Sequence, residues 1–131
     1  MSYKIKTGSA KILIIDDEPE ITEIVETFLT EAGYIVAVEN SPLNAVSKAK
    51  EFKPDVVLLD IMMPGSDGYA VCKELKQDPD FADTPINFLT GKDREDDQGR
   101  SFQSGGDMYI KKPFSCERLL EIVNIVLMSI S

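Results

Sequence analysis

Three carboxylates and one lysine stand where short apolar runs of the chain end. In chain order these are Asp16 and Asp17 after residues 12–15, Asp60 after residues 56–59, and Lys112 after residues 108–110. Because the carboxyl ends of parallel strands meet at one edge of a sheet, we expect these side chains to converge. A carboxylate is nucleophilic enough to attack a phosphorus atom whose transition state is loose, so this group of charges could support phosphoryl transfer.

Length, composition and charge narrow the class of protein. The chain has 131 residues, of which 43% are hydrophobic, which is enough for one domain with a substantial core. Its net charge of -9 disfavours direct binding of nucleic acid, which needs clustered Lys and Arg. The chain has no membrane-spanning run and no signal-peptide pattern, so we expect a cytoplasmic protein whose partners are other proteins.

Cysteine and histidine usage excludes several kinds of catalysis. Cys72 and Cys116 are far apart and form no CxxC pattern, so we interpret both as reduced packing residues. The chain contains no histidine, which excludes Ser-His and Cys-His nucleophilic pairs. A phosphohistidine donor would therefore have to be another molecule.

The hydrophobic pattern alternates between strands and helices along the chain. It predicts strands over residues 11–15, 34–38, 55–59, 86–90 and 108–110. Helical spacing, with Pro19 and Ser41-Pro42 at helix starts, predicts helices over residues 19–32, 42–52, 68–77, 93–104 and 115–130. Five such units predict an α/β fold with a doubly wound parallel sheet in the order 2-1-3-4-5 and five helices. We expect a polar leader at residues 1–10 and a single domain at residues 11–131, with no output domain.

Two of the predicted helices carry informative apolar faces. In the first helix, one stripe is predicted to face the sheet; it comprises Ile21, Ile24, Val25, Phe28 and Leu29. The last helix presents a broad core face made of Leu119, Leu120, Val123, Val126, Leu127 and Ile130. Ile125 and Met128 fall on its otherwise polar side, which suggests a contact surface.

Five sequence pieces resemble the receiver domain of bacterial response regulators, and the resemblance covers residues 11–130. They are Ile15-Asp16-Asp17-Glu18-Pro19, Leu59-Asp60-Ile61-Met62-Met63-Pro64-Gly65, Asp67-Gly68, Phe88-Leu89-Thr90 and Tyr109-Ile110-Lys111-Lys112-Pro113-Phe114. Each piece alone is weak, but all five in this order are specific. The resemblance implies the flavodoxin-like receiver fold and a signalling role in a two-component system rather than that of an enzyme.

The resemblance also implies how the acidic residues divide their work. Asp60 would be the phosphoacceptor, taking a phosphoryl group from a phosphohistidine on a sensor histidine kinase or phosphotransfer protein. Asp17 and Asp60 would bind Mg²⁺ directly, Asp16 would act through water, and the backbone carbonyl of Met62 would complete the protein ligands. Mg²⁺ suits such a site because it accepts a few carboxylates and keeps several waters.

The same resemblance assigns the remaining site residues. Lys112, rather than its neighbour Lys111, would pair with phosphoryl oxygens, and the Lys112-Pro113 bond would be cis. Thr90 and Tyr109 match the switch pair of the family, and Gly91 would present a backbone N–H near the phosphoryl group. The signal would leave through the face built by the fourth helix, fifth strand and fifth helix, toward a downstream protein or a missing output domain, with weak homodimerisation possible.

Other functions fit the sequence less well. The chain contains neither GxxxxGK[ST] nor GxGxxG, the patterns of phosphate-cradling nucleotide enzymes. An Asp-based phosphatase would carry an Asp-x-Asp pattern on the first strand, whereas Asp16-Asp17 is an adjacent pair. The remaining alternative is a receiver-like interaction module that signals without phosphorylation.

Two segments depart from the pattern expected of the family. Asn87 lies in the fourth predicted strand, where apolar residues are usual, and a buried amide without partners costs about 1 to 3 kcal/mol. The helix expected over residues 93–104 has a single large apolar residue, Phe102, and should be the least stable element.

Overall fold

The computed structural model describes residues 10–91 and 108–130. Its main sheet has five parallel strands in the order β2-β1-β3-β6-β7, which confirms the predicted topology. The strands are β1 (Lys11–Ile15), β2 (Ile35–Glu39), β3 (Val56–Asp60), β6 (Ile86–Thr90) and β7 (Met108–Lys111). The helix expected over residues 93–104 lies outside the described residues, and so does the expected leader except for Ala10.

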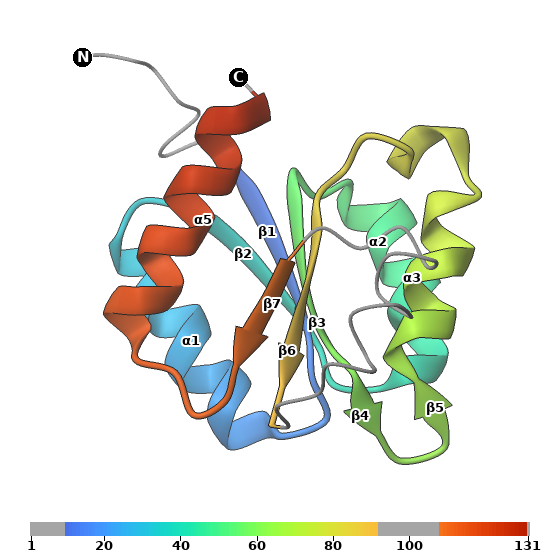
Figure 1. Cartoon of the computed structure of the whole chain (residues 1–131), viewed down its shortest axis with the longest axis horizontal. Helices are drawn as coiled ribbons and strands as arrows, with labels where there is room; N and C mark the ends of the chain where they lie inside the picture. Colours follow the sequence, from blue (N-terminus) through green and yellow to red (C-terminus); the bar gives the residue numbers. More distant parts are fainter. Residues whose placement is uncertain (1–9, 92–107, 131) are drawn as a thin grey trace.

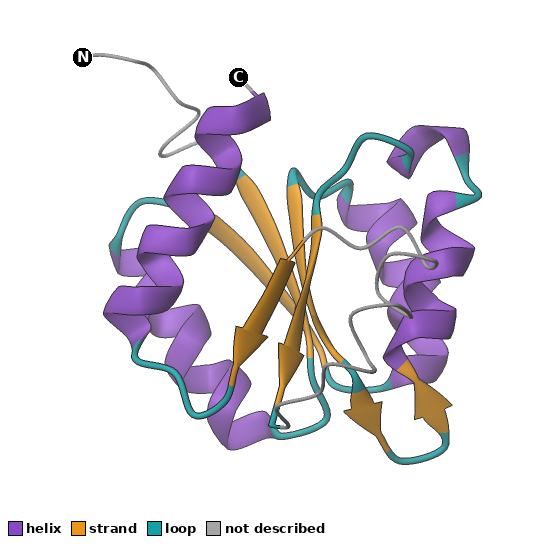
Figure 2. Ribbon diagram, viewed as in Figure 1, coloured by secondary structure: helices purple, strands orange, loops and turns teal. Residues whose placement is uncertain are grey.

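In the described part of the chain, four helices cover the two faces of the sheet, α1 and α5 on one face and α2 and α3 on the other (Figures 1 and 2). They are α1 (Pro19–Glu31), α2 (Ala45–Phe52), α3 (Gly68–Lys76) and α5 (Cys116–Ile130). Short 3₁₀ turns, η1 (Pro42–Asn44) and η2 (Pro79–Phe81), precede α2 and follow α3. Among the described residues, no helix combines the length and apolar character that crossing a bilayer requires.

A separate apolar core fills each side of the sheet. The core beneath α1 and α5 includes Leu58, Leu89 and Val123, and the core beneath α2 and α3 includes Leu59, Phe88 and Leu75. All five residues of β3 are buried, as expected for a central parallel strand. The strand that carries Asp60 is therefore held from both faces.

A two-stranded hairpin that the sequence analysis did not predict follows β3. It pairs β4 (Met62–Met63) with β5 (Ser66–Asp67) in antiparallel fashion. Pro64 and Gly65 form its turn, and Gly65 has a φ of +75°, the positive value that a type II turn requires after proline. The hairpin lies at the carboxyl edge of the sheet (Figure 1).

Two details of the helices differ from expectation. Ile24 does not face the sheet: 61% of its surface is exposed, whereas Val25 and Leu29 of the same helix are buried. The apolar stripe of α1 is thus wider than the core that it covers. At the start of the second helix, Pro42 begins the 3₁₀ turn η1 instead of α2, and the Ser41 side chain makes no capping hydrogen bond.

Candidate functional site

Asp60 is the last residue of β3 and is almost fully buried, with 4% of its surface exposed. Its Oδ1 accepts a hydrogen bond from the backbone N–H of Met62 at 3.1 Å. The next residue, Ile61, donates its N–H to the carbonyl of Leu89 on β6 at 3.1 Å. The hydrogen bonds donated by Ile61 and Met62, the two residues that follow Asp60, therefore fix the direction of its carboxylate.

Gly68 supports Asp60 from the start of α3. Its N–H donates to the carbonyl of Ile61 at 2.9 Å, and a Cβ at this position would lie 2.5 Å from the backbone oxygen of Asp60. Asp67 caps the helix by accepting the N–H of Tyr69 at 2.9 Å. The sequence analysis quoted Asp67-Gly68 as a motif and predicted a helix from residue 68, and neither pattern indicated this close approach to Asp60.

Asp16 and Asp17 follow β1 at the same edge. Asp16 is completely buried, and its Oδ1 accepts the N–H of Glu18 at 3.0 Å. Asn40, which follows β2, donates its side-chain N–H to the backbone carbonyl of Asp16 at 2.7 Å. Asp17 is half-buried. Sequence reasoning missed the positioning role of Asn40, whose signal was its place directly after a strand.

The acidic side chains meet in one pocket. Carboxylate oxygens from Asp16, Asp17, Glu18 and Asp60 lie within 4.8 Å of one another. Such a set of hard oxygen donors fits Mg²⁺, whose charge would offset that of the two buried carboxylates, Asp16 and Asp60. Glu18 belongs to a quoted motif, yet the sequence analysis gave it no role. Met62 contributes its backbone N–H to Asp60; metal binding by its carbonyl stays a prediction.

Lys112 extends from the end of β7 into this pocket. Its Nζ lies 2.8 Å from Asp16 Oδ2, 3.2 Å from Glu18 Oε1 and 3.6 Å from Asp60 Oδ2. Lys111, the alternative, is exposed on β7. The Lys112-Pro113 peptide bond is cis, as expected. Burial lowers the pKa of Lys112, but its hydrogen bond to Asp16 and the charges of Asp16 and Asp60 outweigh burial and raise that pKa above its ordinary value.

The surroundings of Asp60 disfavour the ionised form of its carboxyl group. Burial raises its pKa from 3.8 to about 7, and the negative charge of Asp16 adds to the rise. Lys112 and the N–H of Met62 act in the opposite direction. A cation bound beside Asp60 would stabilise the ionised form of its carboxyl group.

The other predicted site residues lie on β6, directly after it and on β7. Thr90 ends β6 and is 5% exposed, and its backbone carbonyl accepts the N–H of Lys112 at 2.6 Å. Gly91 follows it at the surface, with space for a Cβ. Tyr109 is half-buried, packs 5.7 Å from Phe88 between ring centroids, and shares a short hydrogen bond with the hydroxyl of Tyr69. Tyr69 was not singled out in the sequence.

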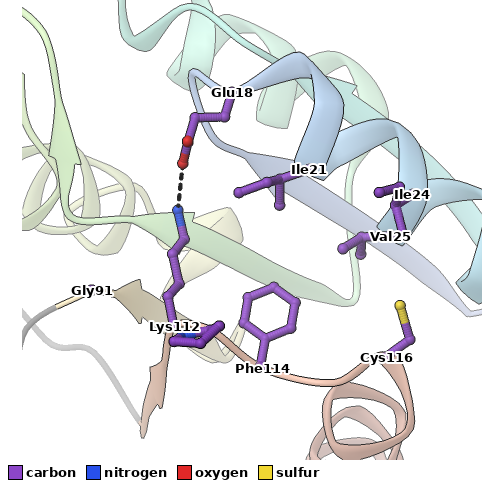
Figure 3. A pocket seen from close by; sticks show the side chains of 9 residues that line it. Glu18, Ile21, Ile24, Val25, Gly91, Lys112, Phe114 and Cys116 are labelled. Carbon is purple, nitrogen blue, oxygen red and sulfur yellow. Dashed lines mark hydrogen bonds and ion pairs between the residues drawn. The ribbon is translucent and has the colours of Figure 1, made fainter.

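An apolar groove adjoins the acidic pocket (Figure 3). It has a volume of about 530 Å³. Ile21, Ile24 and Val25 of α1 line one side, and Phe114 and Cys116 line the other. Glu18 and Lys112, which belong to the acidic pocket, also line the groove. A molecule seated there would therefore contact the charged groups beside Asp60.

Comparisons with known proteins agree with this geometry. The sequence profile described as "Response regulator receiver domain" matches residues 12–124. The chain is 38% identical over 117 residues to the DNA-binding dual master transcriptional regulator RpaA of Synechocystis, and 41% identical over 117 residues to the probable transcriptional regulator ycf27 of Guillardia theta. These alignments cover 89% of this chain but 48% and 45% of the relatives, so the chain spans about half their length.

The fold has close counterparts among solved structures. The chemotaxis protein CheY4 of Vibrio cholerae superimposes with a TM-score of 0.87 at 30% sequence identity. The superposition covers 90% of this chain and 98% of that one. The similarity thus extends over nearly the whole described fold.

Proposed function

This chain belongs to the family of response regulator receiver domains, the signalling domains of two-component systems, and we propose that it accepts a phosphoryl group on Asp60. One observation carries the proposal. Carboxylate oxygens of the buried Asp60 and of three other acids lie within 4.8 Å of one another, and Lys112 reaches into the same pocket. The donor would be a phosphohistidine of a sensor histidine kinase or phosphotransfer protein. It would have to lie on such a second protein because this chain has no histidine.

In the proposed reaction, an oxygen of Asp60 bonds to phosphorus while the bond from phosphorus to the histidine nitrogen breaks. With its second ring nitrogen already protonated, the histidine leaves as a neutral imidazole, and the product is an aspartyl phosphate. Lys112 Nζ, which lies 3.6 Å from Asp60 Oδ2, would pair with a phosphoryl oxygen.

Asp17, Asp60 and the carbonyl of Met62 would hold Mg²⁺, with Asp16 acting through water. When bound, the cation would supply positive charge that offsets the acids and the incoming phosphoryl oxygens. Asp16 is fixed by its bonds to Glu18 and Lys112. The pocket therefore keeps its shape through hydrogen bonds of the protein itself.

Phosphorylation would be reported by Thr90 and Tyr109. The Thr90 hydroxyl would turn toward a phosphoryl oxygen, with the N–H of Gly91 beside it, and the space left behind would let the ring of Tyr109 move inward. That movement would bias the surface of β7 and α5, which carries the signal to a downstream protein or an output domain. The groove along α1 offers the donor protein an apolar surface next to Asp60.

The proposal is tested by incubating the protein with Mg²⁺ and a small phosphodonor such as acetyl phosphate, and measuring its intact mass. We expect one phosphoryl group per chain, and none when the metal is removed by a chelator. If the mass does not increase in the presence of Mg²⁺, the proposal fails, and an interaction module that works without phosphorylation becomes the better account.

A further inference from the structure

The partners of Lys112 divide into a fixed one and a movable one. Its Nζ donates to Asp16 Oδ2 at 2.8 Å and to Glu18 Oε1 at 3.2 Å, while Asp60 Oδ2 is farther away, at 3.6 Å. The Asp16 side chain is fully buried, whereas 52% of the Glu18 side chain is exposed. Glu18 is therefore the partner that can leave when Lys112 turns toward a phosphoryl oxygen.

Glu18 is not needed as a helix cap. It occupies the N-cap position of α1, but its side chain makes no capping hydrogen bond. Instead, the side chain accepts a hydrogen bond from Lys112, and both side chains line the apolar groove (Figure 3). One Glu18 carboxylate oxygen lies within 4.8 Å of an Asp60 oxygen, so a donor that reacts with Asp60 comes close to the charge of Glu18.

We propose that Glu18 is a positioning and specificity-determining residue: its carboxylate holds Lys112 back from Asp60 and disfavours small phosphodonors in proportion to their negative charge. This inference rests on the proposed phosphorylation of Asp60. In that reaction Asp60 bonds to phosphorus while the phosphorus–oxygen bond of acetyl phosphate, or the phosphorus–nitrogen bond of phosphoramidate, breaks. Acetate leaves in the first case; ammonia leaves in the second.

The two donors differ in charge, because acetyl phosphate is more negative than phosphoramidate at neutral pH. At this separation, one unit of charge in a half-exposed site changes a rate by about threefold to tenfold. Glu18→Gln should therefore raise the rate with both donors, and raise the ratio of the acetyl phosphate rate to the phosphoramidate rate by at least about threefold. Glu20→Gln, which removes an exposed charge from the first turn of the same helix, should leave the ratio unchanged.

A second variant separates the two effects of Glu18. Glu18→Asp keeps the charge but is too short to hold Lys112 as Glu18 does, so it should raise both rates and leave their ratio near that of the original protein. Salt provides a test without substitution: about 1 M KCl, where the Debye length is about 3 Å, screens the carboxylate, so the ratio should rise in the original protein and rise less in Glu18→Gln.

Rates are measured by intact mass at saturating Mg²⁺, with thermal melting as a control for folding. An unchanged donor ratio in a folded Glu18→Gln, or a ratio in the original protein that does not respond to salt, overturns the inference. If the original protein is phosphorylated by neither donor, the proposed function itself fails. The two failures are therefore distinguishable.

Discussion

Single residues determine the charge balance of the pocket, and Asp60 dominates it. Burial and the neighbouring charge of Asp16 raise the pKa of Asp60 from 3.8 to about 7. Between these two values the native protein retains a proton that the unfolded chain releases. The free energy of unfolding without metal should therefore fall as the pH rises from about 4 to about 7.

Asp60→Asn removes this titration, so we expect its free energy of unfolding to fall less over the same pH range and to exceed that of the original protein at pH 7. Urea denaturation at a series of pH values, in the presence of a chelator, measures both. Asp80→Asn, an exposed position outside the pocket, should behave like the original protein. Equal slopes for Asp60→Asn and the original protein would show that Asp60 ionises without penalty.

At the scale of elements, β6 contains an unusual buried amide. Asn87 is fully buried, and neither its Nδ2 nor its Oδ1 has a hydrogen-bond partner in the part of the chain that the structure describes. It aligns with Leu58 of β3, on the sheet face covered by α1 and α5. Asn87→Val should stabilise the protein by about 1 to 3 kcal/mol, because it removes unpaired polar atoms and places a β-branched side chain in a strand.

Asn124 provides the opposite case for comparison. It lies on α5 and accepts a short hydrogen bond from the hydroxyl of Tyr34, a buried residue. Asn124→Val leaves that hydroxyl without its acceptor and should destabilise the protein by about 1 to 3 kcal/mol. Urea denaturation of both variants measures the two effects. A destabilised Asn87→Val would indicate that the amide has a structural partner.

The junction between β3 and α3 depends on the absence of a side chain at Gly68. A Cβ there would lie 2.5 Å from the Asp60 backbone oxygen, so Gly68→Ala must displace the end of β3. We expect a loss of about 1 to 3 kcal/mol in stability and slower phosphorylation. At Gly91 a Cβ would meet no described residue within 4 Å, so Gly91→Ala should leave stability unchanged. Equal melting temperatures for the two variants would contradict the role given to Gly68.

The comparison between sequence and structure shows which interactions a local pattern encodes. The apolar runs before Asp16 and Asp60 correctly predicted strands that end beside these residues. An apolar run that stops at a polar residue can be recognised from neighbouring positions alone. The exposure of Ile24 could not be predicted, since helical spacing shows which residues share a face but not how far the sheet extends beneath it. The hydrogen bond from Lys112 to Glu18 joins segments far apart in the sequence. The close approach of Gly68 to Asp60 depends on how the chain between them folds, so no hydrophobic pattern reports either contact.

At the scale of the whole molecule, α5 presents the apolar surface that its sequence predicted. Ile125 and Met128 are 58% and 45% exposed. We expect a weak homodimer through this face when the protein carries a phosphoryl mimic such as beryllium fluoride. Replacing both residues with serine should weaken association at least about tenfold, because it removes apolar area from the contact.

Light scattering over a range of concentrations measures this association. Ile35→Ser is the matched control, because Ile35 is also exposed but lies on β2, at the opposite edge of the sheet. Association that persists in the double variant, or that is lost equally in Ile35→Ser, would rule out this face as the dimer contact.

The central claim is that the pocket at the carboxyl edge of the sheet exists to phosphorylate Asp60. Its most direct test compares intact masses of the original protein, Asp60→Asn and Asp80→Asn after incubation with Mg²⁺ and acetyl phosphate. The account predicts one phosphoryl group on the original protein and on Asp80→Asn, and none on Asp60→Asn. A full mass increase in Asp60→Asn would contradict it, because the phosphoryl group would then be on another residue.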